Sequence, residues 1–224
     1  QLPHRLALVS LLTVSAAALA AHKEPVNNSD RGKPAVQHRF LKCGWNSKGV
    51  EIVDRDMKAE WKYDGNVERS DAWHLADGGV VISFSHRKPK KIGGIKRFDS
   101  KGRLKWTWTT DEGFDNHTCQ PLPNGRFLAG LSTKGHAYMV EVDDSGKEAA
   151  RLEVELPQKL KERTMRDIHH VFRHCRKTCD GTYLGASMSY GKAIEWDARG
   201  KVIGEFPQCK YTAFRLPNGN TLVS

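Results

Sequence analysis

A recurring turn motif is seen most fully in Phe98-Asp99-Ser100-Lys101-Gly102-Arg103-Leu104-Lys105-Trp106. In each copy an Asp is followed four residues later by Lys or Arg, and in three of four copies a Gly directly precedes the basic residue. Asp accepts hydrogen bonds from its own backbone at a turn entrance, and Gly supplies the positive φ that closes a hairpin. The motif therefore predicts one hairpin corner per copy, and the copies begin at Asp54, Asp99, Asp143 and Asp197.

A second motif recurs in phase with the first. Four of its five copies contain Asp-Gly or Asn-Gly ahead of a short strand-forming segment, as in Asn124-Gly125-Arg126-Phe127-Leu128. Its copies lie about 45 residues apart on average, which is the length of one four-stranded β-propeller blade. We therefore expect an all-β propeller of four-stranded antiparallel blades, with about four blade periods visible in a fragment of a larger ring. The copies end at Leu41, Val81, Leu128, Leu184 and Leu222.

The N-terminal segment has the features of an export signal. The apolar run Leu6–Ala20 follows Arg5 and ends in the small residues of a signal-peptidase site. We predict a signal peptide at residues 1–21, a linker at 22–37 and a propeller at 38–224 that is incomplete at its C-terminus. Because no later segment is apolar enough to span a bilayer, we expect no transmembrane segment in the mature chain and a periplasmic or extracellular location.

Export permits disulfides, and the chain has five cysteines. Cys175 and Cys179 are the closest pair in sequence, but an extended strand would separate their Cα atoms by about 13 Å, which is beyond disulfide reach. They can bond only if that segment bends. The other interpretation is that cysteines pack as small apolar side chains in the core.

The repeats resemble those of secreted bacterial PQQ-like (quinoprotein-like) β-propellers. Phe98–Trp106 is similar to their Asp-x-x-Gly-Lys-x-x-Trp repeat, and Leu122-Pro123-Asn124-Gly125 and 216–223 resemble a signature of the arylsulfotransferase-like group. The resemblance covers residues 38–224. The quinoprotein dehydrogenases that this repeat resembles have many Trp-bearing blades, a Ca²⁺-bound quinone and often two adjacent cysteines. This sequence has no adjacent cysteines and Trp at the matching place in two copies, so we expect no bound cofactor.

Candidate site residues follow from the expected blade order. The innermost strands of a propeller line its central channel, and His117, His169 and His170 precede or begin such strands. We expect them to meet at one channel mouth. The segment 157–166, predicted as a loop or helical turn, should overhang this mouth and make it electropositive through Lys159, Lys161, Arg163 and Arg166. The candidate ligand-binding residues are thus His117, His169, His170 and Arg166.

A dense set of potential metal ligands surrounds the same region. Their spacing matches no standard zinc pattern, and adjacent residues of a strand point to opposite faces. His169 and His170 should therefore be unable to share an ion, and the sequence predicts no metal site. The set comprises His169, His170, His174, Cys175 and Cys179.

The charge balance bears on partners. The net charge is +10, and basic residues are concentrated in His86–Lys91 and Lys159–Lys177. Such charge attracts anionic partners, whereas nucleic acid is disfavoured because no aromatic-basic recognition motif is present. We expect a binding or scaffold domain for an anionic ligand, a polysaccharide or other surface polymer, or a protein partner. The alternative, implied by the resemblance, is an arylsulfotransferase-like enzyme in which a channel-mouth histidine accepts the transferred group.

Overall fold

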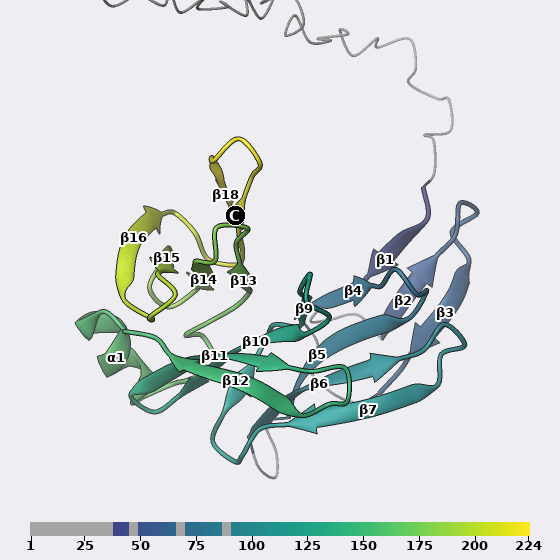
Figure 1. Cartoon of the computed structure of the whole chain (residues 1–224), viewed down its shortest axis with the longest axis horizontal. Helices are drawn as coiled ribbons and strands as arrows, with labels where there is room; N and C mark the ends of the chain where they lie inside the picture. Colours follow the sequence, from purple (N-terminus) through teal and green to yellow (C-terminus); the bar gives the residue numbers. More distant parts are fainter. Residues whose placement is uncertain (1–37, 45–48, 66–69, 87–90) are drawn as a thin grey trace, which may run out of the picture. The chain divides into compact units, whose positions relative to one another are not determined.

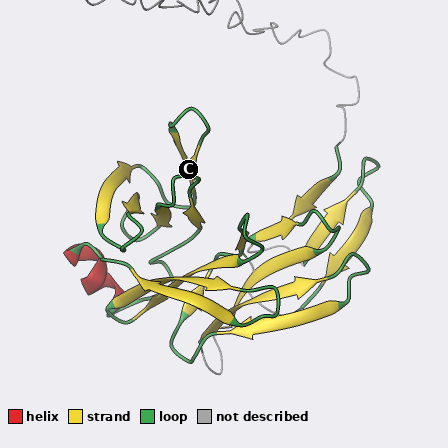
Figure 2. Ribbon diagram, viewed as in Figure 1, coloured by secondary structure: helices red, strands yellow, loops and turns green. Residues whose placement is uncertain are grey.

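The computed structural model describes residues 38–44, 49–65, 70–86 and 91–224 (Figure 1). The predicted signal peptide (1–21) and linker (22–37) lie outside the described residues. The described part consists of antiparallel β-sheets and one helix, α1 (Gln158–Thr164) (Figure 2). No helix in it has the length and hydropathy needed to span a bilayer.

Two four-stranded sheets, one five-stranded sheet and two shorter sheets follow one another along the described part of the chain. The first sheet contains β1 (Phe40–Lys42), β2 (Val50–Val53) and β3 (Ala59–Tyr63). The second contains β4 (Ala72–His74), β5 (Val80–His86), β6 (Ile92–Phe98) and β7 (Leu104–Thr109). The third contains β8 (Asp115–Asn116), β9 (Gln120–Pro121), β10 (Phe127–Thr133), β11 (His136–Val142) and β12 (Glu148–Glu153). The fourth contains β13 (Cys175–Lys177), β14 (Tyr183–Ser187), β15 (Lys192–Trp196) and β16 (Val202–Pro207), and the last contains β17 (Ala213–Arg215) and β18 (Thr221–Val223).

The repeated sheet is the blade of a β-propeller, which confirms the predicted fold class. In the second and fourth sheets the strands pair in chain order, β4-β5-β6-β7 and β13-β14-β15-β16. In the third sheet the first strand is broken, because β8 and β9 pair separately with opposite ends of β10. The break lies at residues 117–119, so the third blade carries a short irregular segment at its first strand.

The predicted Asp turns occupy equivalent corners. In every copy the Asp Oδ1 accepts backbone N–H bonds from the residues two and four positions later, at 2.8–3.0 Å. The turns join β2 to β3, β6 to β7, β11 to β12 and β15 to β16. Gly102, Gly146 and Gly200 have φ between 77° and 80°, and Met57 adopts φ 63° where the first copy has no Gly. The sequence prediction of four equivalent corners is confirmed.

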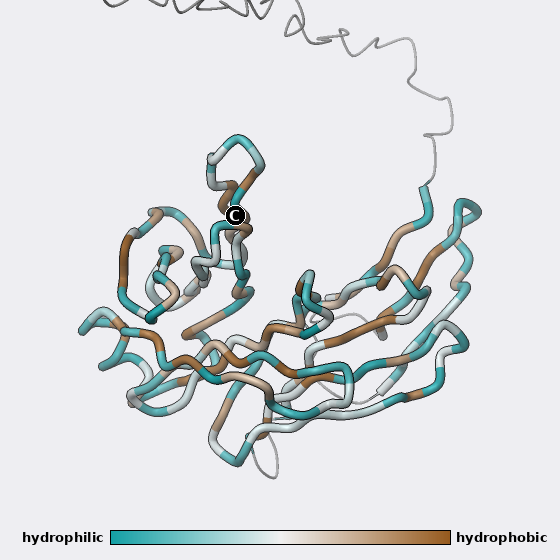
Figure 3. The backbone as a smooth tube through the Cα atoms, in the orientation of Figure 1, coloured by the Kyte–Doolittle hydropathy of each residue, from teal (hydrophilic) through white to brown (hydrophobic). Residues whose placement is uncertain are grey.

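The core lies between successive sheets. Strands β5 and β10 are buried along almost their whole length, as expected for strands covered on both faces. One cluster joins Val81 and Ile95 of the second sheet to Leu131 and Val140 of the third. Another joins the third sheet to Trp196, which is fully buried. The hydrophobic segments lie mostly within strands, and the turns are mostly hydrophilic (Figure 3).

Neighbouring blades also meet at the Asp turns. The indole of Trp61 in β3 lies against Gly102 of the following sheet, and Trp106 in β7 lies against Gly146 of the next. A Cβ atom at residue 102 would come within 2.6 Å of Trp61 Nε1. Gly is thus required at this corner for two reasons: the backbone has a positive φ, and the Trp61 ring leaves no room for a Cβ atom.

The predicted loop at 157–166 contains helix α1. Leu160 is buried with Val171 and Phe172 in the core between the third and fourth sheets, and this contact fixes the helix. No disulfide links any two of the five cysteines, all of which lie within the described ranges. Cys175 is buried at the start of β13, whereas Cys179 is exposed just beyond that strand.

Candidate functional site

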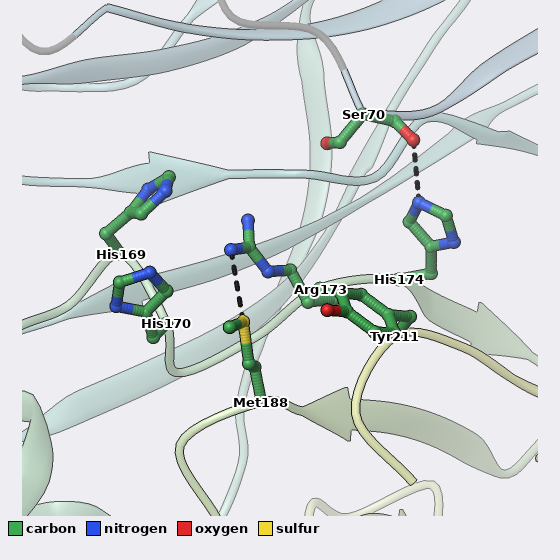
Figure 4. A pocket seen from close by; sticks show the side chains of 7 residues that line it. All are labelled: Ser70, His169, His170, Arg173, His174, Met188 and Tyr211. Carbon is green, nitrogen blue, oxygen red and sulfur yellow. Dashed lines mark hydrogen bonds between the residues drawn. The ribbon is translucent and has the colours of Figure 1, made fainter. Parts of the chain in front are cut away.

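A pocket of about 550 Å³ lies among segments that lead into the first strands of several blades. Ser70 precedes β4, the segment 169–174 precedes β13, and Tyr211 precedes β17. In Figure 4 the Arg173 guanidinium lies between the His169–His170 side and the His174–Tyr211 side of the pocket. The lining residues are Ser70, His169, His170, Arg173, His174, Met188 and Tyr211.

The predicted histidines lie together. The ring centroids of His117 and His169 are 5.0 Å apart, and those of His169 and His170 are 4.8 Å apart. The predicted proximity of His117 to His169 is therefore confirmed, although 52 residues separate them. The expectation that His169 and His170 point to opposite faces of a strand is wrong, because both lie in the turns between α1 and β13 and both line the pocket.

Asp115 in β8 holds this cluster together. Its Oδ2 lies 2.9 Å from His169 Nδ1, 3.3 Å from His117 Nε2 and 3.0 Å from Lys91 Nζ, and Ser85 Oγ donates to its Oδ1 at 2.6 Å. Burial alone would raise the pKa of Asp115, but the His117, His169 and Lys91 side chains hold it well below its usual range. The carboxylate is therefore ionised in a site with 1% residue exposure.

The histidines that line the pocket differ in their environment. Burial lowers the pKa of His169 and of His174, so both imidazoles are neutral at pH 7. His174 Nε2 donates to the Ser70 carbonyl at 2.7 Å, and His170 Nδ1 lies 2.7 Å from Asp167 Oδ2. Arg173, whose Nη2 is 3.4 Å from Met188 Sδ, supplies a permanent positive charge.

A buried ion pair fixes the strands beside the pocket. Arg176 Nη1 and Nη2 donate to Asp71 Oδ2 and Oδ1 at 2.8 and 3.0 Å, and the Cys119 amide donates to Asp71 Oδ2 at 3.0 Å. The Arg176 guanidinium also lies over the rings of Trp73 and Phe214, at 5.3 and 5.0 Å. Burial would raise the pKa of Asp71, but the Arg176 charge and these hydrogen bonds lower it.

The basic residues near α1 lie elsewhere. Arg166 lines a separate pocket of about 230 Å³ with Ser189 and Tyr190, and Lys161 lines a third pocket of about 390 Å³. The prediction that these cations share the opening with His169 is wrong, because Leu160 and Thr164 form the buried face of the helix and its Lys and Arg side chains lie on the exposed face. A ligand-binding role for Arg166 stays a prediction.

Sequence reasoning missed Asp115, Arg173 and Tyr211, and it considered His174 only as a potential metal ligand. Asp115 and His117 form an Asp-x-His pattern, and residues two apart on a strand share a face, so this signal was available. Arg173 lies in the basic segment Lys159–Lys177, where no sequence pattern distinguishes it from the other basic residues. Asp115, His117 and His169 also lie close enough together to hold a metal ion. Ligand spacing within one segment did not reveal this group, because His169 lies 52 residues after His117 on the connection to the next blade.

Comparisons with known proteins identify the fold. The chain matches a protein of unknown function from Bacteroides caccae at 20% identity with a TM-score of 0.68, covering 81% of this chain and 62% of that one. It matches a gluconolactonase from Xanthomonas campestris at 11% identity and TM-score 0.58, covering 83% and 65%. It also matches virginiamycin B lyase from Staphylococcus aureus at 13% identity and TM-score 0.53, covering 84% and 63%.

These likenesses show the β-propeller fold alone, because sequence identity is low. The chain spans about three fifths of the length of the structures it matches. No protein-family model matches the sequence. No curated protein matches it either. What this β-propeller chain binds or does therefore rests on its own residues.

Proposed function

We propose that the protein is a β-propeller that binds an organic anion in the pocket around Arg173. The observation that carries this proposal is the position of the Arg173 guanidinium within the pocket, among three imidazoles and a Tyr ring (Figure 4). Arg presents donors in a planar fork that suits carboxylate and sulfate groups. The neutral rings of His169 and His174 add hydrogen-bonding groups without adding charge.

The pocket favours a ligand with both a charged and an apolar part. Its volume of about 550 Å³ is within the range of small-molecule sites. Met188 and the Tyr211 ring provide apolar surface, whereas Arg173 and His170 provide polar groups. An aryl sulfate or the terminal uronate of an acidic polysaccharide has this combination of parts.

Calorimetric titration with phenyl sulfate, with phenol and with a short polygalacturonate tests the proposal. We expect the two anions to bind, phenol to bind at least tenfold more weakly, and affinity for the anions to fall as salt rises. Arg173→Gln should lower anion affinity at least tenfold. Arg103→Gln, whose exposed side chain pairs with Asp99 in the Asp turn of the second blade, is the matched control and should leave affinity unchanged. Equal affinity of the two variants would overturn the proposal.

A second candidate function is group transfer through His169. Its support is the His169 Nδ1 to Asp115 Oδ2 distance of 2.9 Å, which orients the ring and leaves Nε2 as the basic nitrogen, together with the lowered pKa. Attack of Nε2 on an aryl sulfate would form an N–S bond as the S–O bond to the aryl group breaks and the aryl oxide leaves.

Turnover of an aryl sulfate and an aryl phosphate separates the two candidates. If the protein is an enzyme of this kind, the wild type releases phenol, His169→Ala abolishes release, and phenyl sulfate still binds to that variant. His117→Ala and His170→Ala complete the set of histidines predicted from the sequence. A wild type that binds phenyl sulfate without any turnover is a binding protein for these ligands.

We also propose membership of the PQQ-like, arylsulfotransferase-like group and export to the periplasm or beyond. The support is the Asp-x-x-Gly-basic repeat for the first and the apolar run Leu6–Ala20 for the second. On this proposal the ligand or partner is a surface polymer, an extracellular small molecule or another exported protein. Cell fractionation tests the location, and recovery of the protein in the cytoplasm with residues 1–21 intact would refute export.

A further inference from the structure

The Asp115 cluster brings three potential ligand atoms together from the third blade and from the segment that connects α1 to β13. One ligand atom from each of Asp115, His117 and His169 lies within 4.8 Å of the other two, and the three residues are buried. Two imidazoles and one carboxylate form the ligand set that proteins use for divalent first-row transition metals. The cluster is therefore chemically suited to a cation, quite apart from the identity of any organic ligand.

The two distances from the histidines to the Asp115 oxygen fit a shared ion. Donor atoms about 2.1 Å from one ion lie about 3.0 Å apart at right angles and about 3.4 Å apart at a tetrahedral angle. The Asp115 oxygen lies 2.9 Å from His169 Nδ1 and 3.3 Å from His117 Nε2. A hydrogen-bonded network gives similar distances, so the orientation of the rings is needed to separate the two arrangements.

The Ser70 hydroxyl bears on the orientation of His117. Ser70 Oγ lies 2.8 Å from His117 Nδ1 and donates to the His117 carbonyl at 3.2 Å. When the hydroxyl donates to that carbonyl, it accepts from Nδ1–H, and Nε2 of the ring faces the Asp115 carboxylate. Either a proton on Nε2 or a bound cation can then lie between the ring and the carboxylate. Metal-binding histidines commonly donate their other ring N–H to a neighbouring oxygen in this way.

The carboxylate is positioned for the same role. Ser85 Oγ donates to Oδ1 at 2.6 Å, which leaves Oδ2 directed at the imidazoles. Lys91 Nζ lies 3.0 Å from Oδ2 and is the cation that a metal ion would have to compete with. Lys91 retains 20% side-chain exposure, so its ammonium group has a route to solvent when another cation binds.

We propose that Asp115, His117 and His169 bind one divalent first-row transition-metal ion at the edge of the Arg173 pocket. Three protein ligands leave at least one coordination position for water or for an anionic group. His169 belongs to both the cluster and the pocket lining, so the ion borders the pocket. When Nδ1 of His169 binds the ion, the ring proton moves to Nε2, and a loaded cluster therefore excludes His169 as the nucleophile of the second candidate function.

The test uses the full chain, stripped with a chelator and then titrated with Co²⁺ and Zn²⁺ in the absence of any organic ligand. Equilibrium dialysis with elemental analysis should give one ion per chain, and Co²⁺ should show the visible absorption of a low-coordinate site. Asp115→Asn and His117→Gln should each weaken binding at least tenfold. Lys91→Met should strengthen it, because the competing cation is removed.

His136→Gln is the matched control. His136 Nδ1 lies 2.7 Å from Glu153 Oε1, so the pair has the same chemistry, but it is exposed and has no third ligand in the described part of the chain. This variant should bind metal as the wild type does. Circular dichroism of each metal-free variant shows whether it folds. If Asp115→Asn does not fold, the metal affinity of Lys91→Met decides the test.

Two outcomes would overturn the proposal. One is the absence of stoichiometric binding by both the wild type and Lys91→Met. The other is binding that the His117→Gln and His136→Gln variants weaken equally. In either case the cluster is a hydrogen-bonded network. Because no organic anion is present, neither outcome affects the proposed role of Arg173.

Discussion

Trp61 packs its indole directly on Gly102, which belongs to the Asp turn of the next blade. A Cβ atom at residue 102, where φ is 77°, would meet Trp61 Nε1 at 2.6 Å. We expect Gly102→Ala to be destabilising through backbone strain of about 1–2 kcal/mol and through displacement of the indole. Urea unfolding measures the loss.

Gly125→Ala is the control for this prediction. Gly125 has φ 78°, but a Cβ atom there would meet nothing within 4 Å. The two variants share the backbone strain and differ in the ring contact, so Gly102→Ala should lose more stability. Equal losses would mean that the Trp61 contact contributes nothing to blade packing.

The Asp71–Arg176 pair predicts a large effect of a small substitution. Asp71→Asn leaves the Arg176 charge buried, at 4% residue exposure, without its counter-ion, and we expect a loss of about 3–5 kcal/mol in the free energy of unfolding. Glu60→Gln, whose carboxylate is 40% exposed beside the exposed Arg39, should change it by less than about 1 kcal/mol. Similar effects in the two variants would contradict this account of the buried pair.

His174 predicts a dependence of stability on pH. Burial lowers its pKa below the ordinary value of 6.5, so the unfolded chain binds more protons than the folded chain as the pH falls below 6.5. Stability should therefore be full above that pH and decline below it. The lowered pKa of Asp71 acts in the same direction, with its contribution lost below an ordinary value of 3.8.

His174→Gln isolates the first of these losses, because Gln can still donate to the Ser70 carbonyl. Free energies of unfolding at pH 7.5 and 5.5 should differ less in this variant than in the wild type. The exposed His136→Gln variant should keep the wild-type difference. If His174→Gln keeps it as well, His174 is not a source of the pH dependence.

The cysteines predict an order of thiol reactivity. Cys179 is exposed and should react quickly with a disulfide reagent under native conditions. Burial raises the pKa of Cys175 to about 12 and that of Cys119 well above its ordinary range. Both should react only after unfolding, and a Cys179→Ser variant should lose the fast phase. Fast native labelling of Cys175 would mean that β13 opens readily.

The repeat motifs predicted the fold because the turns are local. The Asp of each turn, such as Asp99, accepts the same backbone hydrogen bonds in every copy. The distance in sequence between successive turns therefore identifies the four-stranded unit. The site was predicted in part. His117 and His169 were found because strand order brings the entries of successive blades together. Asp115 and Arg173 were missed, since their roles depend on which side chains face them from other blades, and the basic residues of α1 were misplaced because burial of Leu160 orients that helix.

The contacts of Asp71 have a consequence for how the molecule comes apart. Repeat proteins whose units touch only their neighbours can fray from an end, one unit at a time. Here a single carboxylate binds the Cys119 amide of the third sheet and the Arg176 guanidinium of the fourth, and that guanidinium also contacts Phe214 of the last sheet. Loss of the fourth sheet would leave the buried Asp71 carboxylate of the second sheet without its counter-ion. The second, third, fourth and last sheets should therefore unfold together in one cooperative transition, without a populated partly frayed state.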